Sequence, residues 1–465
     1  MSNKIKFGTD GWRAIIARDF TTDNVRRVSE GVSRWLHQQK SNPIVVIGHD
    51  CRFGGKLFLE EAAKVFVNNG IKVYFSPVFV STPMVSLGTR HLKADLGVVI
   101  TASHNPPEYN GYKLKGSFGG PLLPDDILAV ENLIPDHTNP INENILYNNP
   151  LFIKSDLRDL YLDAIKNTFN LEAINQSPFR FGFDAMYGAG QYVMNTLFPE
   201  IELLHCTENP GFEGIAPEPI LRNLTEFSDF IRVSEAIDCG LATDGDADRI
   251  GLFDDQGNFV DSHHIILLLI HYLVHYKKQS GKVITAFSVS EKIKKICSHY
   301  NLEQHTTPIG FKNITGFMLN EDILLGGEES GGIAIKGHIP ERDGIWMGLI
   351  IWEFMAETGK TLRDLIDEVY QIVGPFAYDR LDLHLTEELK QHIVAQCKNG
   401  AYQTFGNRRV KRTEDIDGYK FLFENDDWLL IRASGTEPLL RIYAETSTAD
   451  ETQQLLHEVR KTIGA

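Results

Sequence analysis

Cysteine is scarce in this chain, and its few cysteines are far apart in the sequence. The 465 residues include five of them: Cys51, Cys206, Cys239, Cys297 and Cys397. The number is odd, and no two of them have the close spacing of paired metal-binding cysteines. This pattern argues against a disulfide-stabilised secreted protein, and we expect a reduced, cytoplasmic one.

Long apolar runs are also lacking. The longest, residues 265–276 (IILLLIHYLVHY), is too short to span a bilayer and contains two histidines, so we predict a buried helix. His271 and His275 are four residues apart, but no third ligand is nearby, which favours a core-edge pair over a metal site. The first residues, MSNKIKFGTDGW, lack the apolar segment of a signal peptide. We therefore expect no membrane partner.

Basic residues are outnumbered by acidic ones, 46 to 62, which gives a net charge of −16. Such a surface argues against nucleic acid as a partner, because phosphate backbones bind to basic surfaces. A small anionic substrate remains compatible with it, since a few local arginines can bind one phosphate. The pattern GxxxxGK[ST] is absent, so the chain has no nucleotide-binding P-loop of that kind.

Apolar segments typical of buried strands alternate with helical segments through about residue 365. The strand-like segments are residues 43–50, 71–77, 95–100, 179–185 and 282–288, and residues 58–70 are typical of an amphipathic helix. This alternation predicts α/β layers with parallel or mixed sheets. The length suggests about three or four domains.

A weak internal repeat supports several related units. Residues 94–105, 237–248 and 321–332 each contain an aspartate, a short apolar strand and then a loop of small and polar residues. Strand ends are where open α/β sheets bind ligands. We therefore predict three related α/β domains, each presenting one loop to a common site.

The last hundred residues have a different pattern. Residues 419–425, 427–434 and 439–447 are typical of strands in one sheet, and residues 449–463 are typical of a helix. We predict a smaller C-terminal α+β domain, which a linker containing Gly374 and Pro375 precedes. The predicted domains are residues 1–150, 151–255, 256–370 and 371–465.

The segment TDGDADR places three carboxylates, Asp244, Asp246 and Asp248, within five residues. Carboxylates at this spacing can converge on one hard divalent cation. An EF-hand is disfavoured because its sixth position, normally glycine, is Arg249 and because a strand-like segment follows. An aspartyl phosphatase of the haloacid-dehalogenase type stays open, and it would leave Ser103 without a role.

The segment TASHNPPEYNGYK follows a predicted strand. Asn105 precedes a proline, which disfavours a helix beginning at Ser103, although a turn role stays open. A serine hydroxyl becomes a nucleophile only beside a base or metal. His104 is adjacent, and we predict that a turn at Asn110-Gly111 brings Lys113 back towards the serine. This combination suits phosphoryl transfer.

Two further loops have the composition of ligand-binding loops. In GGEESGG, Glu328 and Ser330 can project to the same side and bind vicinal sugar hydroxyls, although a solvated flexible loop fits equally well. In RASGTEPLLR, the arginine, hydroxyl and glycine residues can form a phosphate-binding turn, and a plain β-turn is the alternative.

These four loops, in this order, resemble those of the α-D-phosphohexomutase superfamily of phosphoglucomutases, phosphomannomutases and phosphoglucosamine mutases. The likeness covers the whole chain and includes KFGTDGWR, DAMYGAG and APEPILRNL. It implies four domains around a central cleft and an enzyme that interconverts hexose 1-phosphate and hexose 6-phosphate. It also implies Mg²⁺, a hexose 1,6-bisphosphate intermediate and activator, and a monomer rather than a dimer.

The resemblance also implies roles for individual residues. The implied catalytic residues are Ser103, which carries the phosphate, Arg13, His104 and Lys113, with the last two as candidates for proton handling. The implied magnesium ligands are Ser103, Asp244, Asp246 and Asp248. The residues implied in substrate binding are Arg249, Lys312, Glu328, Ser330, Arg432, Ser434, Gly435, Thr436 and Arg441.

The sugar is less clearly indicated than the reaction. Glucose-specific relatives often have GEESFG, which GEES here resembles, and Phe311-Lys312 after a glycine resembles some glucose enzymes. Gly332, however, stands where phosphoglucosamine and dual-specificity mutases have histidine. We favour phosphoglucomutase, with mannose phosphates as further substrates, over phosphoglucosamine mutase. A metal-dependent sugar-phosphate phosphatase and a non-catalytic sugar-phosphate-binding protein remain alternatives from other classes.

Overall fold

The computed structural model describes residues 4–234, 236–433 and 439–464. It consists of two compact units. The first contains residues 1–284 and 310–366, and the second contains residues 285–309 and 367–465. Within the described residues, no helix combines the length and apolar character needed to cross a membrane.

The first unit begins with a mixed six-stranded sheet of order β1-β5-β4-β2-β3-β6. Its strands are β1 (Trp12–Ile15), β2 (Ile44–His49), β3 (Lys72–Phe75), β4 (Leu96–Ile100), β5 (Tyr109–Gly116) and β6 (Phe152–Lys154). β2, β3, β4 and β6 pair in parallel, whereas β5 pairs antiparallel with both β4 and β1. The three predicted strands in this region are confirmed.

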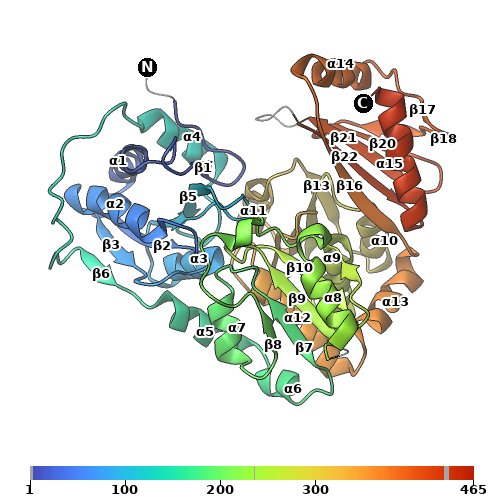
Figure 1. Cartoon of the computed structure of the whole chain (residues 1–465), viewed down its shortest axis with the longest axis horizontal. Coiled ribbons are helices and arrows are strands. Elements are labelled where there is room, and N and C mark those ends of the chain that lie inside the picture. Colours follow the sequence, from blue (N-terminus) through green and yellow to red (C-terminus); the bar gives the residue numbers. More distant parts are fainter. Residues whose placement is uncertain (1–3, 235, 434–438, 465) are drawn as a thin grey trace. The chain divides into compact units, whose positions relative to one another are not determined.

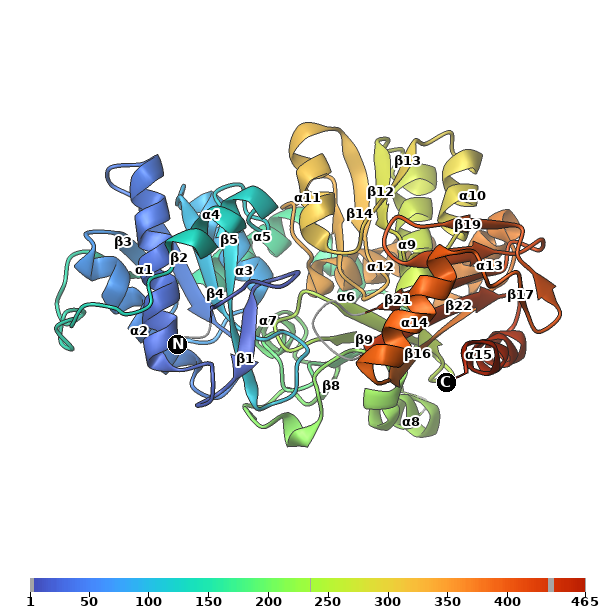
Figure 2. The same ribbon diagram turned by 90° about the horizontal axis from the view of Figure 1, so that it is seen from above.

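Helices cover both faces of this sheet. They are α1 (Thr22–Gln39), α2 (Gly55–Asn68), α3 (Thr82–His91) and α4 (Pro124–Leu133). Val45 and Ile47 on β2 point into a core shared with α1 and α2, which lie together in Figures 1 and 2. Gly48, the residue after Ile47, points to the opposite face of the sheet, towards Val80 just before α3 and Val85 on α3. Because successive residues of a strand point to opposite faces, the sheet is covered by helices on both sides and forms the middle of three layers.

A second mixed sheet in the same unit has the order β11-β10-β9-β7-β8. Its strands are β7 (Phe181–Asp184), β8 (Glu202–Leu204), β9 (Cys239–Thr243), β10 (Ile250–Asp254) and β11 (Phe259–Val260). The helices of this region are α5 (Leu157–Thr168), α6 (Leu171–Asn175), α7 (Gln191–Leu197) and α8 (Thr225–Ser234). β9 is parallel to β7 and antiparallel to β10, so residues 244–249 form the turn of a hairpin.

The remaining part of the first unit carries another antiparallel strand pair, β14 (Ile323–Gly327) with β15 (Ile333–Ile335). Its helices are α9 (Ser262–His271), continued by a π-helical turn (η3, Tyr272–Tyr276), α11 (Phe311–Asn320) and α12 (Gly344–Thr358). The buried helix predicted for residues 265–276 is confirmed. β12 (Lys282–Ala286) and α13 (Leu362–Val373) carry the chain across the unit boundaries.

The predicted repeat has a clear structural counterpart. β4, β9 and β14 each end directly before one of the three loops, and each loop leads into an antiparallel partner, β5, β10 or β15. The apolar strand and the polar loop therefore form the same strand–loop–strand element three times.

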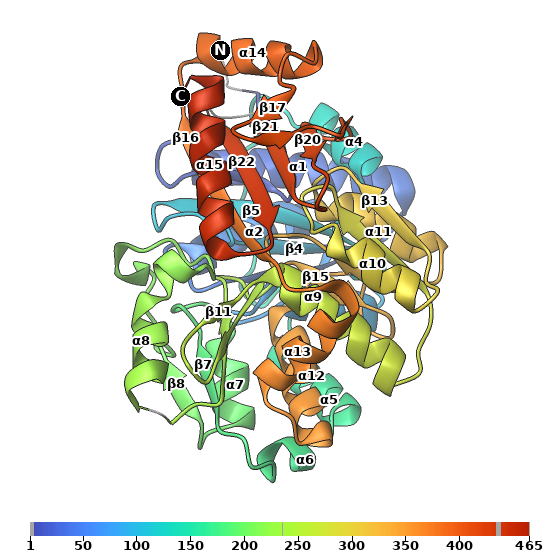
Figure 3. The same ribbon diagram turned by 90° about the vertical axis from the view of Figure 1, so that its right-hand side faces the viewer.

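The second unit contains an antiparallel sheet of order β16-β22-β21-β20-β19. The strands of this sheet are β16 (Ala377–His384), β19 (Arg412–Glu414), β20 (Tyr419–Leu422), β21 (Trp428–Ala433) and β22 (Leu439–Thr446). The unit also contains the hairpin of β17 (Thr404–Phe405) with β18 (Arg408–Arg409), the strand β13 (Gln304–Thr307) and the helices α10 (Lys292–His299), α14 (Glu387–Lys398) and α15 (Ala449–Ile463). α15 packs against β16 and β22 (Figure 3). The predicted C-terminal sheet and helix are confirmed.

Candidate functional site

Ser103 lies in the loop that follows β4, and its backbone adopts a left-handed conformation with φ of 54°. Its N–H donates to Thr101 Oγ1 at 2.9 Å, and its carbonyl accepts from Arg52 Nη2 at 2.6 Å. A non-glycine residue in this conformation is uncommon and is often found at functional sites. The loop therefore holds Ser103 in one fixed, fully buried position.

The hydroxyl of Ser103 points into the cluster formed by the second loop. It donates to Asp244 Oδ2 at 2.6 Å, and His104 Nδ1 lies 3.3 Å from Ser103 Oγ. Burial of the imidazole, together with the positive charges of Arg249 and Arg13, lowers the pKa of His104 well below its ordinary value. A neutral imidazole beside the hydroxyl has the protonation state of a base.

The three aspartates of the second loop converge between β9 and β10. Asp244, Asp246 and Asp248 are fully buried, and one carboxylate oxygen from each lies within 4.8 Å of the others. Asp244 Oδ1 accepts the N–H groups of Asp248 and Arg249 at 2.9 and 3.1 Å, which closes the loop. Burial and the two neighbouring carboxylates raise the pKa of Asp244 well above its ordinary value.

This cluster has the chemistry of a hard-cation site. Asp246 Oδ1 and Asp248 Oδ1 are buried and have no hydrogen-bond partner. A buried carboxylate oxygen without a partner is costly, and oxygen ligands of this kind are those that Mg²⁺ and Ca²⁺ prefer. The residues present therefore fit a divalent cation.

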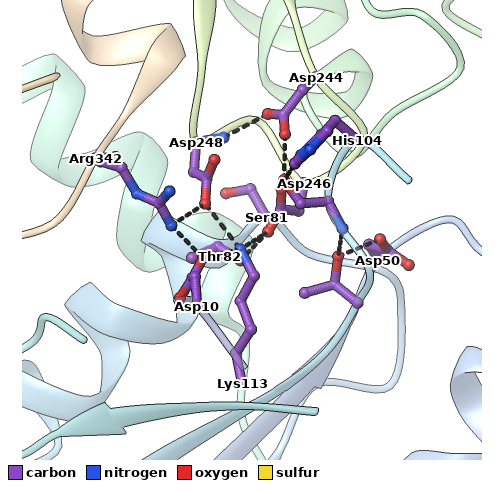
Figure 4. A network of polar contacts seen from close by, with 12 residues as sticks. Asp10, Asp50, Ser81, Thr82, His104, Lys113, Asp244, Asp246, Asp248 and Arg342 are labelled. Carbon is purple, nitrogen blue, oxygen red and sulfur yellow. Dashed lines mark hydrogen bonds and ion pairs between the residues drawn. The ribbon is translucent and has the colours of Figure 1, made fainter. Parts of the chain in front are cut away.

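Lys113 lies on β5 and reaches the same cluster. Its Nζ is 2.7 Å from Asp246 Oδ2, 2.8 Å from Asp248 Oδ2 and 2.7 Å from Asp10 Oδ2 (Figure 4). Burial alone would lower the pKa of Lys113, but these carboxylates outweigh it and raise the pKa. In this arrangement Lys113 is a cation, which favours charge neutralisation over proton transfer.

The predicted turn at Asn110-Gly111 is wrong. Both residues are part of β5 and pair with Ala14 and Arg13 on β1. The chain reverses earlier, in the segment 101–108, and Lys113 reaches the site because it lies opposite Val99 in the β4–β5 register. A Cβ at Gly111 would come within 2.4 Å of the Thr101 carbonyl, so the glycine serves close strand packing rather than a turn.

Arg13 also approaches the serine loop. Its Nη1 donates to Asn105 Oδ1 at 2.8 Å, and its Nη2 is 3.9 Å from Asp10 Oδ2. β1, the edge strand that carries Arg13, is thus tied to the loop of Ser103.

Two residues that the sequence analysis did not single out, Asp10 and Arg342, contact the charged groups of this site. Arg342 is buried and contacts Asp248 Oδ2 at 2.6 Å and also Asp10 (Figure 4). Asp10 in turn contacts Lys113. The only sequence signal was proximity: Asp10 is in the segment that contains Arg13, and Arg342 lies between Glu341 and Asp343.

The residues predicted to bind or to flank the sugar lie in the first unit. Glu328 is buried, and its Oε1 accepts the N–H of Gly310 at 2.8 Å, which links two loops. Ser330 and Lys312 are half-buried. Arg249 is buried, and its Nη1 is 3.6 Å from Glu218 Oε1. The segment of Gly310 and Lys312 therefore lies next to the segment of Glu328 and Ser330.

Gly332 adjoins Arg342. A Cβ at Gly332 would lie 2.4 Å from Arg342 Cδ and 3.0 Å from Cγ, closer than real Cβ contacts permit. The absence of a side chain at 332 therefore gives Arg342 the room to reach Asp248. Glycine rather than histidine at position 332 therefore has a structural reason in this chain.

Of the predicted phosphate-binding residues, Arg432 and Arg441 lie in the second unit, and Ser434, Gly435 and Thr436 lie outside the described residues. Arg432 and Arg441 are directly paired across β21 and β22. Arg432 Nε donates to Asp417 Oδ1 at 3.0 Å, and Arg441 Nε is 3.9 Å from Asp382 Oδ1. The two arginines are thus register partners at neighbouring backbone positions, and each guanidinium group has a carboxylate of its own.

Glu328 provides a test through pH. Burial raises the pKa of Glu328 to about 7 from an ordinary value of 4.5, so the folded state binds this proton more tightly than the unfolded chain does. The resulting stabilisation is fully present below about pH 4.5 and is lost as the pH rises through about 7. Glu328→Gln stays neutral, so its stability relative to the natural protein should increase over this range, by on the order of 2–3 kcal/mol.

Thermal unfolding of both proteins between pH 4.5 and 8 measures this difference. Glu388→Gln, at an exposed position on α14, controls for the loss of one carboxylate. A difference between the Glu328 variant and the natural protein that is constant with pH would contradict the expectation.

Four successive segments match the descriptions of one protein family. Residues 4–140, 159–257 and 261–373 match the alpha/beta/alpha domains I, II and III of phosphoglucomutase/phosphomannomutase, and residues 386–462 match its C-terminal domain. The fold prediction of three α/β domains with mixed sheets and a C-terminal domain with an antiparallel sheet is thereby confirmed.

Curated relatives match along the whole length. A phosphoglucomutase/phosphomannomutase of Thermococcus kodakarensis is 29% identical, covering 97% of this chain and 96% of that protein. A phosphoglucosamine/phosphogalactosamine mutase of Sulfurisphaera tokodaii is 28% identical, covering 98% of both. A crystal structure from Thermus thermophilus, provisionally named a phosphomannomutase, is 33% identical with a TM-score of 0.89, covering 100% of both chains.

Proposed function

Because the chain belongs to the phosphoglucomutase/phosphomannomutase family of phosphohexomutases, we propose that it interconverts hexose 1-phosphate and hexose 6-phosphate through a phosphoserine at Ser103. One observation carries this proposal. The Ser103 hydroxyl is fully buried and donates to Asp244 at 2.6 Å inside a cluster of carboxylates suited to a divalent cation. A serine in that position can serve as a phosphoryl carrier.

The proposed reaction has two transfers. In the first, the bond between phosphorus and Ser103 Oγ breaks as a bond to the free sugar hydroxyl forms, giving a hexose 1,6-bisphosphate. The hydroxyl proton passes to a base, for which His104, 3.3 Å from Ser103 Oγ, is our candidate. The bisphosphate then turns end for end, and its other phosphoryl group returns to Ser103.

Charge neutralisation is assigned to the residues around Ser103. Asp244, Asp246 and Asp248 would hold Mg²⁺ together with Ser103 Oγ. When bound, the ion would stabilise negative charge on the transferring group. Lys113, a cation within the cluster, and Arg13, tied to the serine loop, would neutralise the oxygens of the same group.

Binding of the sugar and of the second phosphate is assigned to other loops. Glu328 and Ser330 would bind the ring hydroxyls. The residues proposed to hold the phosphate or to flank the sugar are Arg249, Lys312, Arg432, Ser434, Gly435, Thr436 and Arg441. The neighbouring positions of Arg432 and Arg441 on β21 and β22 support phosphate binding, because arginine binds phosphate oxygens through several N–H donors.

For the sugar we favour glucose, with mannose as a further substrate. The pattern GEES and the Phe311-Lys312 pair after a glycine support this choice over phosphoglucosamine mutase. Phosphoglucosamine mutase is the second candidate, supported by the name of the relative from Sulfurisphaera tokodaii. We further propose domain boundaries near residues 150, 255 and 370, a monomer, and a cytoplasmic location.

A substrate panel tests the proposal. The purified protein would be incubated with the phosphates of glucose, mannose, glucosamine and N-acetylglucosamine, with Mg²⁺ and the matching bisphosphate. Isomerised product from glucose 1-phosphate is expected. Release of phosphate without glucose 6-phosphate would instead identify a phosphatase, and tight binding without turnover would identify a binding protein.

The glycine at 332 gives a second expected result. Gly332→His should reduce kcat/KM for glucose 1-phosphate by roughly 10- to 100-fold, because the new side chain would displace Arg342 from Asp248. The double variant Gly332→His with Arg342→Ala should fold without this clash, because the Arg342 side chain is removed. Gly316→His, where no atom lies within 4 Å of the added Cβ, is the control. Unchanged kinetics in Gly332→His would contradict the steric argument.

A further inference from the structure

Asp10 contacts the cations of the site without belonging to the metal cluster. Its carboxylate, with 12% of the side chain exposed, lies 2.7 Å from Lys113 Nζ, 3.6 Å from Lys115 Nζ and 3.9 Å from Arg13 Nη2, and it also contacts Arg342. Asp10 is absent from the group of carboxylates whose oxygens converge. It is therefore a counter-ion for basic residues rather than a fourth metal ligand.

Lys113 and Arg342 are shared between Asp10 and the metal loop. Lys113 Nζ contacts Asp246 and Asp248, and Arg342 Nη2 contacts Asp248 at 2.6 Å (Figure 4). A divalent cation in this loop would be held by the same carboxylates and would repel both basic groups. Metal binding and the ion pairs of Lys113 and Arg342 therefore compete for the negative charge of Asp246 and Asp248.

Lys115 differs from these two cations because it has its own partner. Its Nζ is 2.7 Å from Glu341 Oε2, and that oxygen also accepts a hydrogen bond from Ser86 at 3.0 Å. The buried Lys115–Glu341 ion pair thus lies away from the carboxylates of the metal loop. Asp10 remains the counter-ion for Lys113 and Arg342.

The backbone brings Asp10 close to Lys113. Gly11 has φ of 94°, and a Cβ there would lie 2.9 Å from the Tyr112 carbonyl and 3.0 Å from Lys113 Cγ. Only a residue without a side chain lets the segment lie directly against β5 at this point. The approach of Asp10 to Lys113 is therefore built into the strand packing.

We propose that Asp10 is a positioning residue that holds Lys113 and Arg342 as counter-ion when a divalent cation occupies the Asp244–Asp246–Asp248 loop, and so strengthens cation binding without being a ligand. The inference rests on the proposed metal site. When Asp10 is neutralised, Lys113 and Arg342 lose a carboxylate outside the loop, although Arg342 keeps Glu341 at 3.7 Å, and both compete more strongly with the metal.

A double-mutant cycle measures this role through Mg²⁺ binding by titration calorimetry of the full-length protein, without an activity assay. Asp10→Asn should weaken Mg²⁺ binding by about 5-fold or more. In the Lys113→Met background the same change should have a clearly smaller effect, because one of the competing cations is absent. Asp10→Glu, which keeps the carboxylate, should stay close to the natural affinity.

Other outcomes would overturn the proposal. An equal effect of Asp10→Asn in both backgrounds would mean that its charge acts on the metal directly, and no effect would mean that Asp10 has no part in cation binding. The same cycle with Arg342→Gln replaces the first if Lys113→Met does not fold. Absence of Mg²⁺ binding by the natural protein would sink the metal site itself, which the cycle separates from a failure of Asp10 alone.

Discussion

Replacing Ser103 with alanine should lower mutase turnover by more than roughly 10³-fold, because the variant has no oxygen to carry the phosphoryl group. Lys113 cannot substitute, since the transferred group must bond covalently to the enzyme between the two half-reactions and a protonated amine has no free electron pair. Turnover is measured as glucose 6-phosphate formed from glucose 1-phosphate with Mg²⁺ and added bisphosphate. The intact mass of the natural protein should also include one phosphate that the variant lacks.

Misfolding has to be separated from the loss of the nucleophile. Ser103 has φ of 54°, a conformation that glycine adopts without strain, so Ser103→Gly should fold well and be equally inactive. Ser298→Ala, at an exposed position on α10, is the matched control and should keep full activity. Full activity in Ser103→Ala would refute the phosphoserine assignment.

Removal of divalent cations should reduce turnover by at least about 10²-fold, and added Mg²⁺ should restore it. Asp246→Asn should cause a comparable loss that excess Mg²⁺ does not fully reverse. Asp246 offers one oxygen to Lys113 and keeps the other, Oδ1, buried without a hydrogen-bond partner. An amide there carries no charge to bind the cation, so both the affinity for Mg²⁺ and the rate should fall.

The metal prediction has its own control. Asp255→Asn lies just after β10, where the carboxylate pairs with Arg363 and belongs to no converging group in the described part of the chain. It should leave the Mg²⁺ dependence of the rate unchanged. Turnover that persists in chelator would rule out the cation, whereas a chelator-sensitive enzyme whose Asp246→Asn variant is normal would place the cation elsewhere.

Much of the candidate site could be predicted because its parts are contiguous in sequence. An apolar strand followed by small and polar residues is a local pattern, and β4, β9 and β14 end at their loops as that pattern predicts. The three aspartates converge because they alternate within one short loop. The C-terminal sheet was likewise predictable from alternating apolar residues.

The misplaced turn illustrates the limit of such patterns. Asn-Gly is a strong turn signal, yet Asn110 and Gly111 are strand residues with partners on β1. Long-range pairing with β1 and β4 outweighs the local preference, and Gly111 is required by the nearby Thr101 carbonyl. Turn propensity alone contains no information about such neighbours.

The sequence alone therefore determined which loops present carboxylates and hydroxyls after a buried strand, because each loop's composition and preceding strand are local properties. Only the tertiary structure decided how the charges are matched. Lys113 meets carboxylates 133 and 135 residues away, and Arg342 meets Asp10 across 332 residues. Such pairs depend on strand register and on the space left by glycines at 11 and 332, which exist only once distant segments have packed together.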